Sequence, residues 1–332
     1  MSAKRSHKPQ LAYSPNVNSP GKRAKTATSS GSTVNDPTIF DPMGYGEHAI
    51  DPRIPPDINL TLPAIFGLFW NDTIITKLVP ATTAYVRQKK VSPQHWPHPT
   101  TVSEFRRFLE ITILMGLARL GKIGRYQSHS IVSARRSMSF NRYCQIKRFI
   151  HISMPDDTVS LCRGSWWKKL EPLSSHLRQQ SQLLGLPGTH LSVDEMMVPF
   201  TGQSFHTVRI LSKPLLVGYK VIALCSSGYT IDWMHTSLTE SFAGLERKPE
   251  LSRTSLAVLQ LCRTLDTKNY SFIVYTDNGF STIPLFRALR EKGIGACSTT
   301  RVNRVDYPSA LENNSLLEWN SIYGYAVGLP SN

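Results

Sequence analysis

The chain has 332 residues, 40% of them hydrophobic, which is enough for one large domain or two ordinary domains with buried cores. No apolar run approaches the roughly 18 to 20 residues of a membrane-spanning helix, and the basic N-terminus MSAKRSHKPQ lacks the apolar segment of a secretory signal. These features argue against a membrane channel and a secreted protein, so we expect a soluble intracellular protein. A formal net charge of +15 favours a polyanionic partner, the alternative being a basic protein without one.

The cysteines are scattered singly and form no Cys-x-x-Cys pair, so neither a zinc finger nor a disulfide framework is indicated. They are Cys144, Cys162, Cys225, Cys262 and Cys297. We expect them to be reduced and mostly buried.

Residues 1–58 are rich in Pro, Ser, Gly, Thr, Asn and Lys and show no helical or strand periodicity, which predicts a disordered basic tail. Two small basic clusters lie in it, at Lys4-Arg5 and at Lys22, Arg23 and Lys25. Clusters of this kind in a flexible tail can act as a nuclear address, which predicts a nuclear location. The alternative is a tail that only increases solubility.

Residues 59–185 have helical periodicity, and we expect a helical domain of the kind that binds DNA or dimerises. Helices are predicted over 62–79, where Pro63 begins the helix, over 101–121 and over 138–152, beginning near Ser139. Thr101 or Ser103 can cap the second helix. Its apolar face is expected to contain Phe105, Phe108, Leu109, Thr112, Ile113 and Gly116. A further helix follows Trp166-Trp167 and ends at the breaker Gly-Leu-Pro-Gly of 185–188.

Residues 186–332 change to a strand-like pattern, which predicts an α/β domain. A strand is expected over 189–200, and two further strands over 219–237 are joined by a hairpin at Ser226-Ser227-Gly228. A helix (252–265), a short apolar strand (270–276), a helix (281–293) and a last strand beginning at Ile294 follow. The order predicts antiparallel strands first and a parallel βαβ unit after them.

Two aspartates interrupt this apolar pattern. Asp194 lies between apolar residues of the first strand, and Asp277 lies at the carboxyl end of the buried run FIVY. Ligand sites of open α/β sheets gather beyond the carboxyl ends of strands, and paired carboxylates attract hard cations. Two Mg²⁺ or Mn²⁺ ions acting on phosphate would suit a nuclease or polynucleotidyl transferase. The simpler alternative for Asp277, which precedes Asn-Gly, is an Asx-turn.

Three segments, read in order, resemble the catalytic region of piggyBac-type DDE transposases: LSVDEMMVPFTGQS, KPLLVGYKVIALCSSGY and YTDNGFSTIPLFRALREKGIGACSTTRVNR. Upstream, EFRRFLEITILMGLARL and MSFNRYCQIKRFIHI resemble the helical region of the same family. The resemblance covers roughly residues 60 to 320. It implies an α/β fold with a ribonuclease H-like mixed sheet, and DNA strand cleavage and transfer with Mg²⁺ or Mn²⁺.

The resemblance also implies roles for individual residues. Asp194 and Asp277 match the first two metal-binding, catalytic aspartates of the family. Basic matches to the family pattern, implied as DNA phosphate contacts, are Lys213, Lys220, Arg301 and Arg304. The alternative for each of these is a solvated basic face. Glu195 follows the first aspartate, and its side chain is expected on the opposite face of the strand, as support and not as a third ligand.

The chain departs from the family pattern near its end. LLEWNSIYGYAVGLPSN resembles the Leu-Pro-Trp-Gly segment that precedes the third aspartate of the family, but Asp306 and Glu312 do not lie in a matching context. We therefore expect the third metal ligand and the cysteine-rich C-terminal DNA-binding domain to be missing, the sheet core to be incomplete, and the chain to be inactive as an enzyme.

Three functions stay open. The first is a truncated transposable element-derived protein of the cut-and-paste type. The second is a domesticated, non-enzymatic protein that binds DNA. The third is an interaction protein whose helical region assembles oligomers. The expected partner for the first two is double-stranded DNA, such as transposon ends, and the resemblance suggests a homodimer on that DNA.

Overall fold

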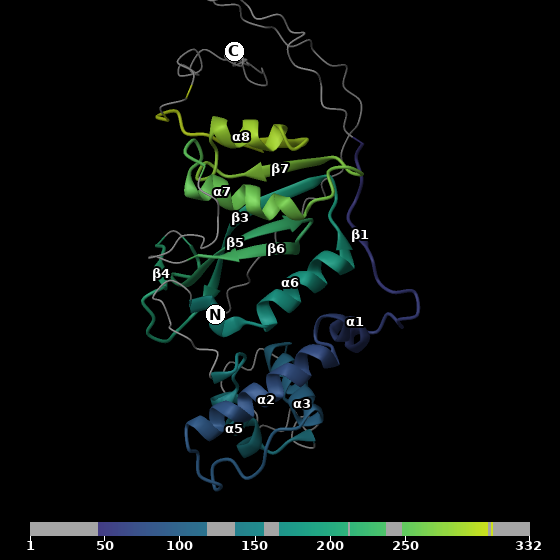
Figure 1. Cartoon of the computed structure of the whole chain (residues 1–332), viewed down its shortest axis with the longest axis vertical. Helices are drawn as coiled ribbons and strands as arrows, with labels where there is room; N and C mark the ends of the chain where they lie inside the picture. Colours follow the sequence, from purple (N-terminus) through teal and green to yellow (C-terminus); the bar gives the residue numbers. More distant parts are fainter. Residues whose placement is uncertain are drawn as a thin grey trace, which may run out of the picture. The chain divides into compact units, whose positions relative to one another are not determined.

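The computed structural model describes residues 46–117, 137–155, 166–211, 213–236, 248–304 and 307 (Figure 1). Residues Met43–Arg301 form one compact unit that contains every helix and strand of the described residues. Helices come first along the chain and a mixed β-sheet follows. The predicted α/β class with a mixed sheet is therefore confirmed.

The helical half contains α1 (Leu62–Phe69), α2 (Asp72–Gln88), α3 (Val102–Leu117) and α5 (Phe140–Phe149). The prediction of one helix over 62–79 is wrong, because Trp70 and Asn71 leave the helical conformation. The Asn71 side chain accepts a hydrogen bond from the backbone N–H of Ile74 and so caps α2, a role that suits asparagine. Thr101 and Ser139 cap α3 and α5 in the same way, as predicted.

The buried face of α3 is formed by Phe105, Phe108, Ile111 and Met115. The sequence analysis placed Ile113 on this face, yet its side chain is 40% exposed. Successive residues of an α-helix are about 100° apart, so a position five residues beyond Phe108 points well away from it. Residues spaced by three and four therefore pack against α2 and α5, and the predicted face of α3 needs this correction.

A 3₁₀ helix, η5 (Trp166–Leu170), leads into α6 (Leu173–Leu184), which ends at Gly185 as the breaker predicts. α6 packs against β6 (Tyr229–His235) of the sheet. Across this contact Arg178 donates two hydrogen bonds to the carboxylate of Asp232, at 2.5 and 3.2 Å. α6 thus belongs in sequence to the helical region and in space to the side of the sheet. The division of the chain at residue 185 stays a prediction.

The main sheet consists of β3 (His190–Pro199), β4 (Val208–Arg209), β5 (Val217–Ser226), β6, β7 (Phe272–Thr276) and β8 (Ile294–Ser298). Its order is β4-β5-β3-β7-β8, with β6 also paired to β5. β5 is antiparallel to β3 and β6, whereas β3, β7 and β8 are parallel. The predicted hairpin turns at Ser227 and Gly228, both with positive φ, which matches the twist of the flanking strands.

Two helices connect the parallel strands and supply the core. α7 (Arg253–Leu261) lies between β6 and β7, and α8 (Ile283–Arg290) connects β7 to β8 (Figure 1). Buried side chains of both helices pack with the sheet, including Leu261, Leu285 and Leu289. The predicted βαβ unit is confirmed, and it fixes the direction in which β7 ends.

Residues 46–53 form a strap that holds the start of the sheet. Within it, β1 (Asp51–Pro52) pairs antiparallel with β2 (Gly185–Leu186). His48 and Thr189 exchange backbone and side-chain hydrogen bonds of 2.8 to 2.9 Å. A side chain at Gly188 would meet the backbone of Ile50 at 2.9 Å, so only glycine fits there. The predicted disordered tail of residues 1–58 is therefore too long, since 46–58 are part of the described structure.

The cysteines are less buried than predicted. Cys144, Cys225, Cys262 and Cys297 carry free thiols, and among these four only Cys262 is buried. Burial raises the pKa of the Cys262 thiol to about 12, so it stays protonated and unreactive at neutral pH. Cys162 lies outside the described residues.

We expect stability to fall on mild acidification because of His235 at the end of β6. Burial lowers the pKa of His235 to about 4, and its Nε2 lies 3.1 Å from Ser174 Oγ of α6. Between pH 6.5 and 4, His235 is protonated in the unfolded chain but stays neutral in the folded chain. The contribution of neutral His235 to the free energy of unfolding is therefore fully present above pH 6.5 and falls by about 2 to 3 kcal/mol toward pH 4. Urea unfolding at several pH values should show this slope, and His235→Gln should flatten it.

Candidate functional site

Asp194 and Asp277 each follow directly after the paired residues of two neighbouring parallel strands. The parallel strands β3 and β7 pair in register from His190↔Ile273 to Val193↔Thr276. The next residue on each strand is Asp194 and Asp277, so the same register places them at neighbouring positions. Adjacent strands are about 4.8 Å apart, which brings the two carboxyl groups within reach of a shared ligand.

The alternation of β3 explains why an aspartate occurs among apolar residues. Leu191 and Val193 are about 1% exposed and belong to the core, whereas Ser192 and Asp194 are exposed. Asp194 therefore lies on the open face of a half-buried strand, and no burial of its charge has to be compensated. Its carboxylate accepts one hydrogen bond, from the backbone N–H of Glu195.

Asp277 also makes the Asx-turn that the sequence left open. Its Oδ1 accepts a hydrogen bond of 2.9 Å from the backbone N–H of Gly279, and its carbonyl accepts one from Ser298 Oγ at 3.0 Å. A Cβ atom at position 279 would lie 3.1 Å from Oδ1, so glycine favours this close turn. The turn fixes the Asp277 carboxylate beyond the end of β7, and it is compatible with a ligand on Oδ2.

Several functional candidates meet at what we call the carboxyl edge. We define it as Asp277 after β7, residues 299–301 after β8, and the part of β3 from Asp194 onward. Since β3, β7 and β8 are parallel, all three lie at the same end of the sheet. The predicted phosphate contact Arg301 belongs to this edge and is exposed, whereas Arg304 belongs to the other compact unit and its role at phosphate stays a prediction. The edge thus combines two acids and Arg301.

Lys213 and Lys220 are both engaged with Glu195. Lys213 Nζ donates to the Glu195 carbonyl at 2.8 Å and lies 4.0 Å from Glu195 Oε2, and Lys220 Nζ pairs with Glu195 Oε1. Glu195 is half-buried and its register neighbours on β5 differ from those of Asp194. This arrangement fits the expectation that Glu195 supports the strand from its other face. A role of the two lysines at phosphate stays a prediction.

We expect the Glu195 cluster to be energetically coupled. The side chains of Glu195, Lys213 and Lys220 are 25 to 31% exposed, so their attraction is only partly screened by water. Glu195→Gln should destabilise the protein by about 1 kcal/mol, and a double-mutant cycle with Lys220→Gln should give a coupling free energy of about 1 kcal/mol. Urea denaturation of the four proteins measures it. Additive effects would show that the ion pair contributes nothing.

A third acid is not found beside the pair in the described part of the chain. Within residues 46–117, 137–155, 166–211, 213–236, 248–304 and 307, no three His, Cys, Asp or Glu side chains form a group that could hold a metal ion. Asp306, Glu312 and Glu318 lie outside the described residues. The loss of the third metal ligand therefore stays a prediction.

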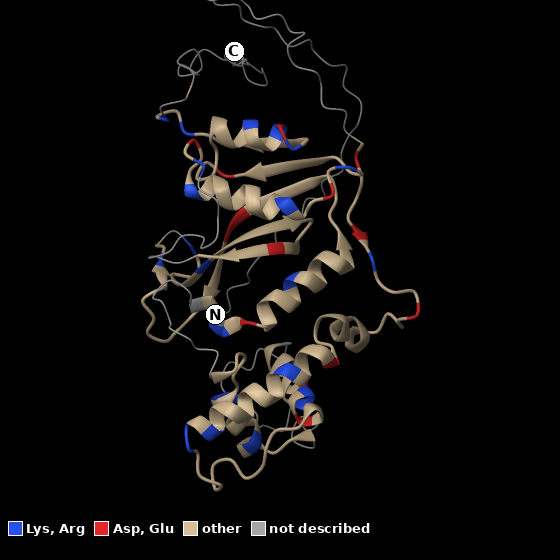
Figure 2. Cartoon of the chain, in the orientation of Figure 1, with Lys and Arg blue, Asp and Glu red and all other residues tan. Residues whose placement is uncertain are grey.

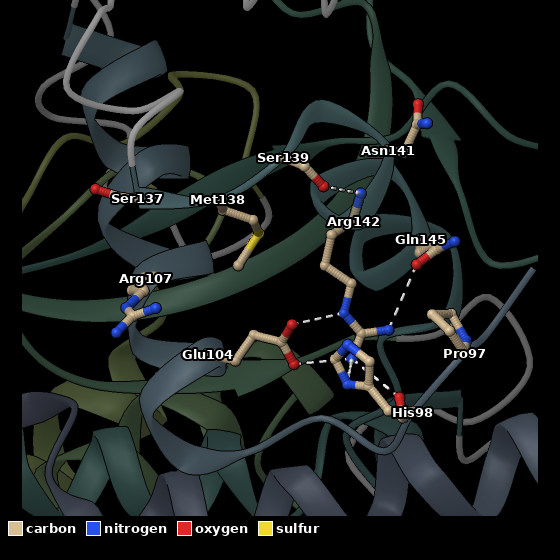
Figure 3. Close-up of a pocket in the computed structure, with 10 residues that line it drawn as sticks. All are labelled: Pro97, His98, Glu104, Arg107, Ser137, Met138, Ser139, Asn141, Arg142 and Gln145. Carbon is tan, nitrogen blue, oxygen red and sulfur yellow. Dashed lines mark hydrogen bonds and ion pairs between the residues drawn. The ribbon is translucent and has the colours of Figure 1, made fainter.

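The sequence analysis missed a polar cavity of about 400 Å³ in the helical half (Figure 3). Arg142, which is 7% exposed, points at Glu104 and donates to both carboxylate oxygens, at 2.6 and 2.8 Å. It also donates to the carbonyl of His98, and its guanidinium stacks on Trp96 at 4.5 Å. Burial alone would raise the pKa of Glu104, but the hydrogen bonds and charge of Arg142 outweigh it and lower the pKa.

Arg142 of α5 and Glu104 of α3 connect the two helices, and we call this pair the clamp. The N–H groups of Arg142 already bind protein groups, which indicates a structural role and not a ligand site. The sequence carries no local signal for this contact. Thr101-x-x-Glu104 has the form of a capping box, yet Glu104 binds Arg142 from another helix, which only the tertiary structure shows.

The described basic residues lie mainly on helices and loops, and few lie on strands. Figure 2 shows blue Lys and Arg residues on α2, α3 and α5, while the strands are mostly tan. The described cations of these helices and the loops next to them include Arg87, Lys89, Lys90, Arg107, Lys147 and Arg148.

Within the described residues, no helix combines the length and apolar character needed to cross a bilayer.

The family model described as Transposase IS4 matches residues 63–327, which is most of the chain. The chain therefore belongs to this family of DDE-type transposases and, within it, to the piggyBac-type transposase-derived proteins.

The human piggyBac transposable element-derived protein 2 is 24% identical over 251 residues, covering 73% of this chain and 40% of the relative. A cryo-EM structure of the piggyBac transposase synaptic complex with hairpin DNA shares the fold, with a TM-score of 0.61 at 22% identity over 76% of this chain and 53% of that one. The chain thus spans about half the length, or less, of these relatives.

Proposed function

We propose that this chain binds double-stranded DNA through the carboxyl edge and that Asp194 and Asp277 are two of the metal ligands of a DNA strand-transfer site. The observation that carries the proposal is the register of β3 and β7, which makes the two acids neighbours on parallel strands. The strand order and the mixed directions of the sheet support a ribonuclease H-like core. The DNA in the related synaptic complex supports the choice of partner.

The two carboxylates fit a hard divalent cation. Mg²⁺ and Mn²⁺ prefer oxygen ligands, and Asp194 Oδ atoms and Asp277 Oδ2 are the groups that would hold one. Such an ion, when bound, supplies charge stabilisation at a phosphate oxygen. Two carboxylates give weaker binding than three, since affinity follows ligand number and charge.

A second function is favoured because the described residues bring two acids together and not three. With only two acids together in the described residues, the chain would bind DNA without cleaving it, as a domesticated DNA-binding protein does. Duplex binding without metal-dependent nicking is the result expected from this function. Nicking in Mg²⁺ or Mn²⁺ would instead require a complete catalytic site.

The test is the salt dependence of binding to labelled duplex DNA, followed by fluorescence anisotropy. Each phosphate contact that is lost should lower the slope of log affinity against log salt by about 1. Arg301→Gln and Arg304→Gln should each show this change. A matched control is Arg263→Gln, because Arg263 is exposed but precedes the amino end of β7. An absence of binding at low salt would contradict the proposal and leave an interaction protein.

Two further features are part of the proposal. The basic clusters Lys4-Arg5 and Lys22, Arg23 and Lys25 would direct the chain to the nucleus, as its substrate requires. Imaging of a tagged chain with these residues changed to alanine tests this. A homodimer on DNA would appear as a two-to-one complex in sedimentation with a short duplex.

A further inference from the structure

The described residues 200–211 and 213–216 follow β3 at the carboxyl edge, and we call them the loop after β3. Its second half is a hairpin in which Val208 and Arg209 of β4 pair with Gly218 and Val217 of β5. Beyond the pairing, the Ile210 N–H donates to the Leu216 carbonyl at 2.9 Å. The hairpin therefore projects from the end of the sheet at which Asp277 lies.

This loop exposes large apolar side chains. Phe205 is 66% exposed, Leu211 is 76% exposed and Leu216 is 45% exposed. A single exposed leucine needs no explanation, but three such residues within one short loop indicate a contact surface. The pattern is typical of a surface that covers an apolar partner.

Contacts within the loop and with the sheet fix the positions of its exposed apolar side chains. Lys213 Nζ donates to the carbonyl of Glu195 on β3 at 2.8 Å. Phe200 packs on Tyr219 with ring centroids 5.0 Å apart. Thr207 Oγ1 donates to the Ser204 carbonyl at 2.9 Å and closes the turn that carries Phe205. Pre-organisation of this kind lowers the entropic cost of inserting a side chain into a partner.

The charges near these side chains indicate the kind of partner. From Pro199 to Lys220 the sequence contains Arg209, Lys213 and Lys220 and no Asp or Glu. Glu195 of β3 pairs with both lysines and offsets one of these three charges, so a net positive charge remains. An apolar tip among cations matches DNA, whose phosphates attract the cations while its base steps accept an apolar wedge. A protein partner would instead call for mixed charges around the rim.

We propose that Phe205 and Leu211 insert against the bases of bound duplex DNA and unstack them near the pair of Asp194 and Asp277. The proposal rests on the proposed DNA binding and adds where and how the duplex is deformed. Phe205 and Leu211 follow Pro199, the last residue of the strand that carries Asp194, so the unstacked step would lie beyond the carboxyl end of β3.

The experiment uses the full chain and a duplex that carries 2-aminopurine, a base whose fluorescence rises when it is unstacked. The wild-type chain should raise this fluorescence on binding. Phe205→Ala and Leu211→Ala should each lose most of the rise and weaken binding about fivefold or more, with an unchanged salt slope, because no charge is removed. Leu183→Ala is the matched control, since Leu183 on α6 is 64% exposed and distant in sequence from the loop; it should behave as wild type.

The outcomes separate this proposal from the one before it. A wild-type chain that does not bind duplex DNA would overturn both. Salt-dependent binding without a fluorescence rise, or a rise that survives in Phe205→Ala and Leu211→Ala, would overturn the wedge alone. Loss of self-association in the two variants with unchanged DNA binding would show that the loop is a protein interface, and would also overturn the wedge.

Discussion

Arg142→Met is expected to destabilise the protein by about 3 to 5 kcal/mol. The guanidinium of Arg142 is the partner of a Glu104 carboxylate whose side chain is only 16% exposed. Without Arg142, the carboxylate would be left largely buried with a charge that water cannot solvate. Urea denaturation at neutral pH measures the loss of the free energy of unfolding.

Two variants show whether the effect comes from the ion pair. Arg106→Met removes an arginine of α3 that pairs with Asp72 of α2, but Arg106 and Asp72 are 42% and 73% exposed, so less than about 1 kcal/mol should be lost. Arg142→Met combined with Glu104→Met should be more stable than Arg142→Met alone, because no charge is stranded. If the double variant is the less stable one, packing and not charge governs the clamp.

The lowered pKa of Glu104 gives this clamp a pH dependence. Its contribution is complete above the pKa that Glu104 has in the unfolded chain, near 4.5. It is lost as the pH falls through the lower pKa of the folded state, since the protonated acid no longer pairs with Arg142. The wild-type chain should therefore lose stability in acid by a step that Glu104→Gln lacks.

Asp194→Ala and Asp277→Ala are each expected to weaken Mn²⁺ binding by at least about tenfold, because each removes one charged oxygen ligand of the proposed site. Isothermal titration calorimetry with Mn²⁺ or Mg²⁺ measures the affinity in the absence of DNA. Both aspartates are exposed, so neither variant should unfold the protein. The Asp266→Ala variant removes an exposed acid elsewhere in the same domain and should bind metal like the wild type.

The titration and a nicking assay on the same proteins have three distinguishable outcomes. Two variants that bind metal as well as the wild type would remove Asp194 and Asp277 from the site. Weak binding lost in both variants, with no nicking of duplex DNA, would indicate a disabled transposase site. Metal-dependent nicking abolished by either change would show that an acid outside the described residues completes the site, and the expected inactivity would be wrong.

The parts of the fold that were predictable depend on local chemistry. The turn at Ser227-Gly228 needs positive φ at two residues, and Thr101 and Ser139 are natural helix caps, so the sequence alone was sufficient for these. The expectation that Asp194 and Asp277 are neighbours rests on a different rule, that the ends of parallel strands meet.

What sequence could not predict depends on partners far along the chain. Nothing local to Glu195 indicates that it binds Lys213 and Lys220, and nothing local to Glu104 indicates Arg142. The break at Asn71 was missed because the apolar period runs through it, and a single capping hydrogen bond outweighed that period. The strap was missed because its composition is that of a flexible tail.

The strap also has a consequence for the order of events during synthesis. His48 leaves the ribosome 141 residues before its partner Thr189. At translation rates of about 5 to 20 residues per second, the strap waits roughly 7 to 28 s for the strand that it pairs with. During this interval α1, α2, α3 and α5 have already been made and can pack by themselves. Until Gly185 to Thr189 have been made, residues 46–53 therefore lack the partners that they have in the folded chain.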